Sequence, residues 1–159
     1  SEWHINYNKM INIALYQPDI PQNAAAIIRL SACLNISVHI IEPCGFNLQD
    51  PRFKRVVMDY SKNAKIITYS DFNKFEKSND KFRIILMTTK AKKNYHEFKF
   101  RNNDILMFGR ESAGVPMEIH KKIDNKLKIL MSKKTRSLNV AMSAAIVSSE
   151  AIRQLSVKR

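Results

Sequence analysis

The sequence predicts one α/β domain built on a mostly parallel sheet with helices on both faces. Segments typical of strands alternate along the chain with segments typical of helices, and several strand segments are apolar along most of their length rather than at alternate positions. Continuously apolar strands are typical of parallel sheets buried on both faces. A length of 159 residues is that of a single domain. We predict this domain over residues 11–159, after an N-terminal extension or expression scar over residues 1–10.

The predicted strands are short segments rich in apolar and β-branched residues. They comprise residues 11–16, 37–41, 65–69, 83–88, 105–108 and 127–131. The predicted helices comprise residues 22–34, 52–58 and 71–77, a short helix after Pro116, and a long final helix that ends near Leu155. Pro51 favours the first turn of the second helix, and Ser70 or Asp71 can cap the third.

In open parallel sheets, ligands bind beyond the C-terminal ends of the strands. The loops expected at that edge are residues 17–21, 88–90, 109–116 and 132–136. Gly109 and Gly114, two of the three glycines in the chain, flank one of these loops. We therefore expect unusual backbone angles or a close ligand approach there. A glycine-rich phosphate loop is absent from the sequence, which argues against a dinucleotide-binding enzyme of Rossmann type.

The junction before the final helix, residues 136–145, is rich in small residues. Such a segment can approach another backbone or a ligand closely, and Ser137 or Asn139 can cap the helix that follows. The segment is either part of a site or an ordinary packing helix, and its residues by themselves favour the packing helix.

The chain carries 27 Lys and Arg against 14 Asp and Glu, a net charge of +13. A polyanionic partner relieves the repulsion within so basic a domain, and nucleic acid comes before an acidic membrane surface. A Lys-rich composition inherited from an AT-rich genome explains the same charge. The basic residues form four clusters: Arg52, Lys54 and Arg55; Lys90, Lys92 and Lys93; Lys121 and Lys122; Lys133, Lys134 and Arg136. The second and fourth follow strand ends, which suits RNA phosphates.

Cysteine and histidine usage predicts no metal site. Cys33 and Cys44 lack metal-ligand spacing, and the four histidines are scattered. A cytoplasmic protein with free thiols is the simplest interpretation. We expect no membrane association, since no apolar segment approaches eighteen residues and the start lacks the apolar core of a signal peptide.

Three segments together resemble one family. They are Pro21-Gln22-Asn23 with Ile27-Ile28-Arg29; Leu106-Met107-Phe108-Gly109 with Glu111 and Gly114-Val115-Pro116; and Arg136-Ser137-Leu138-Asn139. In this order, and in a chain of this length, they resemble the SPOUT class of RNA methyltransferases in its 2′-O-ribose (TrmH-like) branch. The short single-domain members that methylate the wobble ribose of tRNA are the most similar, from about residue 11 to residue 155.

The resemblance implies an α/β fold with a C-terminal trefoil knot and a cytoplasmic homodimer whose active site is shared between subunits. It implies methyl transfer from S-adenosylmethionine to the wobble pyrimidine (position 34) of the tRNA anticodon loop, with S-adenosylhomocysteine as product and no metal. The implied catalytic residues are Arg29, Asn23 and Glu111. The implied cofactor-binding residues are Met87, Gly109, Ile129, Ser137 and Leu138, and the implied substrate-binding residues are Arg136, Asn139 and Lys90.

The chemistry gives these residues different roles. A ribose hydroxyl must be oriented, stabilised as it gains negative charge, and relieved of its proton. Arg29 suits oxyanion stabilisation better than base catalysis, because a guanidinium stays protonated. Ordinary structural roles compete: a surface ion pair for Arg29, and helix capping for Asn23 and for Glu111, the latter before the short helix over residues 115–120.

Several positions depart from the family pattern. Ala25 stands where a glycine is usual, Ala141-Met142 where Ser-Asn is usual, and Ser149 where a tyrosine is common. Two alternatives follow: a related 2′-O-methyltransferase with another RNA target, and a noncatalytic RNA-binding SPOUT protein.

Overall fold

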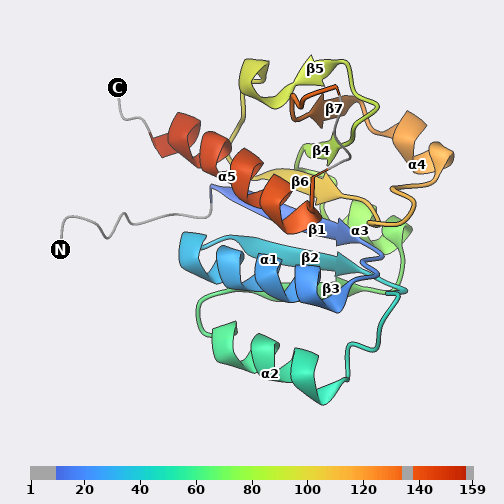
Figure 1. Cartoon of the computed structure of the whole chain (residues 1–159), viewed down its shortest axis with the longest axis vertical. Helices are drawn as coiled ribbons and strands as arrows, with labels where there is room; N and C mark the ends of the chain where they lie inside the picture. The colour runs from blue at the N-terminus through green and yellow to red at the C-terminus, as the bar shows by residue number, and fades with distance from the viewer. Residues whose placement is uncertain (1–9, 134–137, 157–159) are drawn as a thin grey trace.

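The computed structural model describes residues 10–133 and 138–156, and it contains one sheet of seven strands (Figure 1). The strands are β1 (Ile11–Tyr16), β2 (Ser37–Ile41), β3 (Ile66–Tyr69), β4 (Ile84–Met87), β5 (Lys93–Asn94), β6 (Asp104–Phe108) and β7 (Asn125–Lys128). Their order in the sheet is β3-β2-β1-β6-β4-β7-β5, and every pairing is parallel. The predicted parallel α/β architecture is thereby confirmed.

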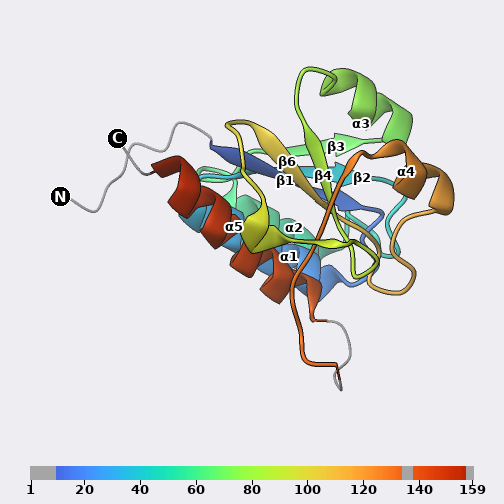
Figure 2. The same ribbon diagram turned by 90° about the horizontal axis from the view of Figure 1, so that it is seen from above.

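Helices cover both faces of the sheet (Figure 2). They are α1 (Pro21–Leu34), α2 (Pro51–Tyr60), α3 (Phe72–Ser78), α4 (Met117–Lys122) and α5 (Val140–Ser156), with a short 3₁₀ helix η1 over Tyr95–Glu97. In β1, Ile13 and Leu15 pack into the core under α1 and α5, whereas Ala14 and Tyr16 pack into the core under α3 and α4. Because successive side chains of a strand alternate between faces, a strand buried on both faces is predominantly apolar along its whole length.

Three helices begin with a side-chain cap. The Asp50 carboxylate accepts a hydrogen bond from Arg52 N–H at 2.8 Å before α2, and Asp71 accepts one from Lys74 N–H at 2.8 Å before α3. Asp71 is thus the cap of α3, in place of Ser70, and the helix begins one residue later than predicted. Asn139 caps α5 by accepting from Ala141 N–H at 2.8 Å, and Ser137, the other candidate, lies outside the described ranges.

Two sequence predictions about strands were wrong. The last strand was placed at residues 127–131, but β7 covers Asn125–Lys128, because pairing with β4 aligns Asn125 with Ile85. Leu130 is instead 67% exposed beyond the strand end. The edge strand β5 was missed because it has two polar residues, and only its pairing with β7 makes it a strand.

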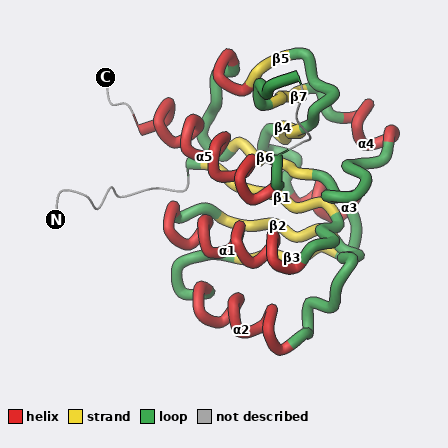
Figure 3. The backbone as a smooth tube through the Cα atoms, viewed as in Figure 1, coloured by secondary structure: helices red, strands yellow, loops and turns green. Residues whose placement is uncertain are grey.

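Helices α1 and α5 lie side by side over the middle of the sheet (Figure 1). Ala24, Ala144 and Ala151 are fully buried in the core beneath them. The small residues of α5 therefore do serve packing, as their composition favoured. In the tube drawing (Figure 3) the loops that follow β1, β2 and β6 gather on one side of the molecule, where α1 and α5 begin.

Within the described ranges, no helix is long and apolar enough to cross a membrane. The implied trefoil knot stays a prediction, since residues 134–137, which connect the end of the sheet to α5, lie outside those ranges.

Candidate functional site

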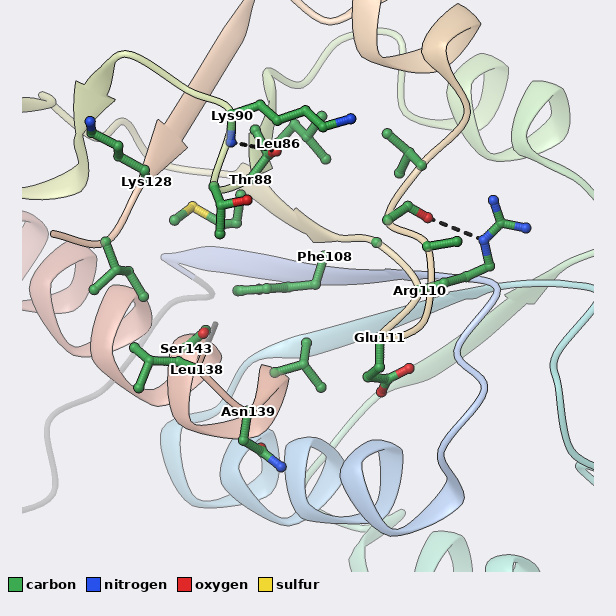
Figure 4. Close-up of a pocket in the computed structure, with 18 of the residues that line it drawn as sticks. Leu86, Thr88, Lys90, Phe108, Arg110, Glu111, Lys128, Leu138, Asn139 and Ser143 are labelled. Atoms are coloured by element: carbon green, nitrogen blue, oxygen red, sulfur yellow. Dashed lines mark hydrogen bonds between the residues drawn. The ribbon is translucent and has the colours of Figure 1, made fainter. Parts of the chain in front are cut away.

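A cavity of about 510 Å³ opens at the C-terminal edge of the sheet, between the ends of β4, β6 and β7 and the start of α5 (Figure 4). Its apolar wall includes Leu86, Met87, Phe108, Ile129 and Leu138. Its polar groups include those of the loop after β6, of Thr88 and Lys90 after β4, and of Asn139 and Ser143 at the start of α5. The site therefore lies at the strand ends where the sequence placed it.

Most of the predicted site residues meet in this cavity. Those that line it are Asn23, Met87, Lys90, Gly109, Glu111, Ile129, Leu138 and Asn139. Arg136 and Ser137 lie outside the described residues. Arg29 is described but does not line the cavity; its side chain is exposed on α1. The structure shows no hydrogen bond or ion pair between Arg29 and another described residue, so the surface ion pair that competed with a catalytic role for Arg29 is absent from that part of the chain.

The glycine-flanked loop after β6 is closed by its own backbone. Arg110 N–H donates to Gly114 O at 3.1 Å, and Gly114 N–H donates to Arg110 O at 2.8 Å. Gly114 has a φ of 63°, which suits glycine. A Cβ on Gly109 would lie 2.7 Å from the carbonyl carbon of Gly114. The expected unusual backbone angle is therefore at Gly114 and the close approach is at Gly109.

A chain of hydrogen bonds joins the three motif segments at the cavity. Asn139 Nδ2, at the start of α5, donates to Asn23 Oδ1 at 2.9 Å. Asn23 Nδ2, in the first turn of α1, donates to Glu111 Oε1 at 3.5 Å. Helix capping does not explain Asn23 or Glu111: the N-caps of α1 and α4 are Ile20 and Pro116, and neither makes a side-chain capping bond.

Asp19, which the sequence analysis did not select, pairs with Glu111 beside the cavity. Asp19 N–H donates to Glu111 Oε2 at 3.2 Å, and Glu111 N–H donates to Asp19 Oδ1 at 3.2 Å. Burial, followed by the interaction with Asp19, raises the pKa of Glu111 above its ordinary value. The hydrogen bond with the Glu111 side chain is the main cause that lowers the pKa of Asp19 to about 2. As the pair titrates, the proton therefore resides on Glu111.

The opposite side of the cavity is basic. Lys90 and Lys128 line it, as does His120 of α4. Burial is the main cause that lowers the pKa of His120, and the nearby charges of Lys126 and Lys90 add to it. This shift disfavours the charged form of His120, and Lys90 and Lys128 supply positive charge on this wall. Among the residues that the structure describes, no group of three or more His, Cys, Asp or Glu side chains could hold a metal ion.

Comparison with known proteins gives the family. The model of the SpoU rRNA Methylase family matches residues 10–149, which is most of the chain. The chain belongs to the SpoU methylase family. The resemblance drawn from three motifs is thereby confirmed, and a dinucleotide-binding enzyme of Rossmann type is excluded.

Individual known proteins are similar over nearly the whole chain. A "tRNA (cytidine(34)-2′-O)-methyltransferase" from Beijerinckia indica subsp. indica is 45% identical over 145 residues, covering 90% of this chain and 91% of the relative. A solved structure described as "Structural insights into the 2-OH methylation of C/U34 on tRNA" has a TM-score of 0.87 and 36% identity, covering 93% of this chain and 97% of that chain. The SpoU methyltransferase AviRb from Streptomyces viridochromogenes, solved in complex with the cofactor AdoMet, shares the fold, with a TM-score of 0.83 at 19% identity over 95% of this chain and 63% of that chain.

Proposed function

We propose that this SpoU methylase transfers a methyl group from S-adenosylmethionine to the ribose 2′-hydroxyl of the pyrimidine at position 34 of tRNA. The observation that carries the proposal is that segments of all three sequence motifs meet in one cavity, where Asn23, Glu111 and Asn139 form one hydrogen-bonded chain. The name of the Beijerinckia indica relative supports the substrate. The reaction is proposed to take place in the cytoplasm.

The cavity has the chemistry that an adenosine-containing cofactor needs. Apolar side chains of Met87, Ile129 and Leu138 suit the flat face of a base, and the close backbone approach at Gly109 leaves main-chain groups at the cavity wall. Ser137 is the remaining predicted cofactor contact. S-adenosylmethionine supplies a methyl group that its sulfonium already makes electrophilic. The residues of this chain must therefore orient the hydroxyl, stabilise the oxyanion that develops and accept its proton.

Arg29 is proposed to act in the cavity of a second subunit. Along α1 and α5 an exposed face contains Ala26 and Arg29 from one helix and Met142 and Ile146 from the other. Met142 is 63% exposed and Ile146 is 36% exposed. An exposed apolar face of this kind is typical of a protein interface, and a two-fold dimer buries the same face twice. In such a homodimer, Arg29 of one subunit stabilises the developing oxyanion in the site of the other.

The departures from the family pattern leave the cavity largely intact. The side chains of Ala141 and Met142 do not line it, whereas that of Ser143 does. Backbone N–H groups of Ala141 and Met142 donate to Asn139 Oδ1, at 2.8 and 3.4 Å. The lost polar side chains are therefore not needed for the Asn139–Asn23 contact, which favours an active enzyme over a noncatalytic RNA-binding protein.

The test of the proposal is methyl transfer from labelled S-adenosylmethionine to unmodified bulk tRNA, followed by nuclease digestion and nucleoside mass spectrometry. We expect 2′-O-methylcytidine or 2′-O-methyluridine, mapped to position 34. A labelled product on ribosomal RNA fragments with none on tRNA would select the alternative target. Cofactor binding and salt-sensitive RNA binding without any labelled nucleoside would select the noncatalytic alternative.

Binding of tRNA should weaken steeply with salt. Lys90 and Lys128 line the cavity, and Lys92, Lys93 and Lys133 are exposed on the adjoining segments. A protein that neutralises six or more phosphates loses about 10³-fold in affinity between 50 and 200 mM salt, because binding releases condensed counterions. Fluorescence anisotropy with labelled tRNA measures this loss.

A pair of triple variants locates the responsible lysines. Changing Lys90, Lys92 and Lys93 together to alanine should lower the slope of log K against log salt by about three. Changing Arg52, Lys54 and Arg55 on α2 removes the same charge farther from the cavity and serves as the control. Equal slopes in the two variants would contradict RNA binding at the cavity wall.

A further inference from the structure

We propose that Asp19 is a positioning residue of the methyl-transfer site, which binds the loop after β6 and orients Glu111 toward Asn23. The inference rests on the proposed function and adds to it a residue outside the three motifs. Asp19 does not line the cavity, so it acts through Glu111, which does.

Reciprocal hydrogen bonds fix Glu111 at two points. Its N–H donates to one carboxylate oxygen of Asp19, and its own carboxylate accepts the N–H of Asp19. The Ser112 hydroxyl donates to the other Asp19 oxygen. Asp19 therefore contacts both the backbone and the side chain of Glu111, and the Oε1 of Glu111 accepts from Asn23 Nδ2.

Asp19 is itself fixed from the opposite side. Gly45, in the loop after β2, donates its N–H to Pro18 O at 2.9 Å. A Cβ at residue 45 would lie 2.6 Å from the Cβ of Asp19. A residue larger than glycine would push Asp19 out of place. The loops after three neighbouring strands, β2, β1 and β6, are thus stacked, with Asp19 in the middle layer.

Charge gives Asp19 a second effect on Glu111. Asn23 and Asn139, which connect Glu111 to α1 and α5, have neutral side chains. The guanidinium of Arg110 instead contacts Gln17 Oε1, at 3.5 Å, and the ring of Tyr16. Among the residues that the structure describes, the carboxylate of Asp19 is therefore the charged group that interacts directly with Glu111, and it opposes ionisation of Glu111.

Three variants separate the effect of Asp19 on the position of Glu111 from the effect of its negative charge. Asp19→Ala removes the bonds to Glu111 N–H and Ser112, and it should lower kcat about 10- to 100-fold, since small misplacements of site residues have such effects, while cofactor affinity changes little. Asp19→Asn keeps an acceptor of the same shape and should restore most of kcat. Ser112→Ala removes one hydrogen bond to Asp19 and retains the charge, so it is the matched control for the pH profile.

Ionised Glu111 is the form that only accepts hydrogen bonds, so activity should fall as the pH drops through its pKa. In Asp19→Asn the lost negative charge lowers the pKa of Glu111, and the acidic limb of kcat/KM should move to lower pH. In Ser112→Ala the acidic limb of kcat/KM should lie at the same pH as in the unchanged protein. A loop that was merely loosened would change kcat without moving the limb.

Titration of the Glu111 carboxyl carbon by NMR, in protein labelled with ¹³C-glutamate and with Glu111→Gln to assign the signal, provides a readout without substrate. We expect a lower midpoint in Asp19→Asn than in the unchanged protein. Equal midpoints, or full activity of Asp19→Ala, would overturn the inference. Absence of methyl transfer by the unchanged protein on any RNA would instead overturn the proposed function, and the NMR titration would still decide the role of Asp19.

Discussion

Replacing Arg29 with alanine should abolish detectable methyl transfer, lowering kcat by about 10³-fold, while S-adenosylmethionine still binds. Removing one group that stabilises an oxyanion lowers kcat by about 10²- to 10³-fold, which is the role proposed for Arg29. Because Arg29 is exposed and lies outside the cavity of its own chain, its loss should not disturb folding or the cofactor site. Single-turnover transfer from labelled cofactor and calorimetric cofactor titration measure the two effects.

Arg55, an exposed arginine on α2, is the matched control for Arg29. Arg55→Ala should keep kcat within about two-fold, as exposed substitutions usually leave the fold unchanged. Arg29→Lys should recover little of the kcat lost in Arg29→Ala, because an ammonium group lacks the planar fork of a guanidinium. Unchanged activity of Arg29→Ala would place the reaction elsewhere on the protein.

Mixing inactive variants tests whether the site is shared. Subunits with Arg29→Ala retain a complete cavity, and subunits with Glu111→Ala retain Arg29. In randomly mixed two-fold dimers, half are hybrids with one intact shared site, so about a quarter of the activity should return. No recovery after mixing would argue that each subunit works alone.

Replacing Gly109 with alanine should abolish cofactor binding, with a loss of at least about 100-fold in affinity. The added Cβ would lie 2.7 and 2.8 Å from the C and Cα atoms of Gly114. These neighbours are backbone atoms bound in the Arg110–Gly114 bridge, so relief requires the loop to open and the cavity wall to move. Calorimetric titration with S-adenosylmethionine measures the loss.

Gly114→Ala is the control for this loop. Gly114 has a φ of 63°, but an added Cβ would meet no atom within 4 Å. The expected cost is only the strain of a left-handed alanine, about 1 kcal/mol, or a fall of about 2–4 °C in Tm, with cofactor binding retained. If Gly109→Ala also bound the cofactor normally, the close approach at Gly109 would have no part in shaping the site.

Local patterns were sufficient for the fold class and for part of the site. Fully apolar segments such as residues 105–108 require burial on both faces, and β6 covers those residues, all of them buried. Asp71 caps α3 because a carboxylate before a helix meets its first N–H groups wherever the helix lies. Gly109 and Gly114 marked the cavity loop because few other residues tolerate such backbone geometry.

What only the tertiary structure decided concerns residues far apart in the chain. Asp19 meets Glu111 across 92 positions and Asn139 meets Asn23 across 116, and no local spacing predicts either contact. The strand β5 exists only through its partner β7. Arg29 shares a motif with Asn23, yet the turn of α1 directs the two side chains to different surroundings. The sequence by itself determined which residues form the elements and the motifs, because capping, burial and backbone strain are local. The order of the strands decided which of those residues share a site, because it alone sets which loops stack on one another.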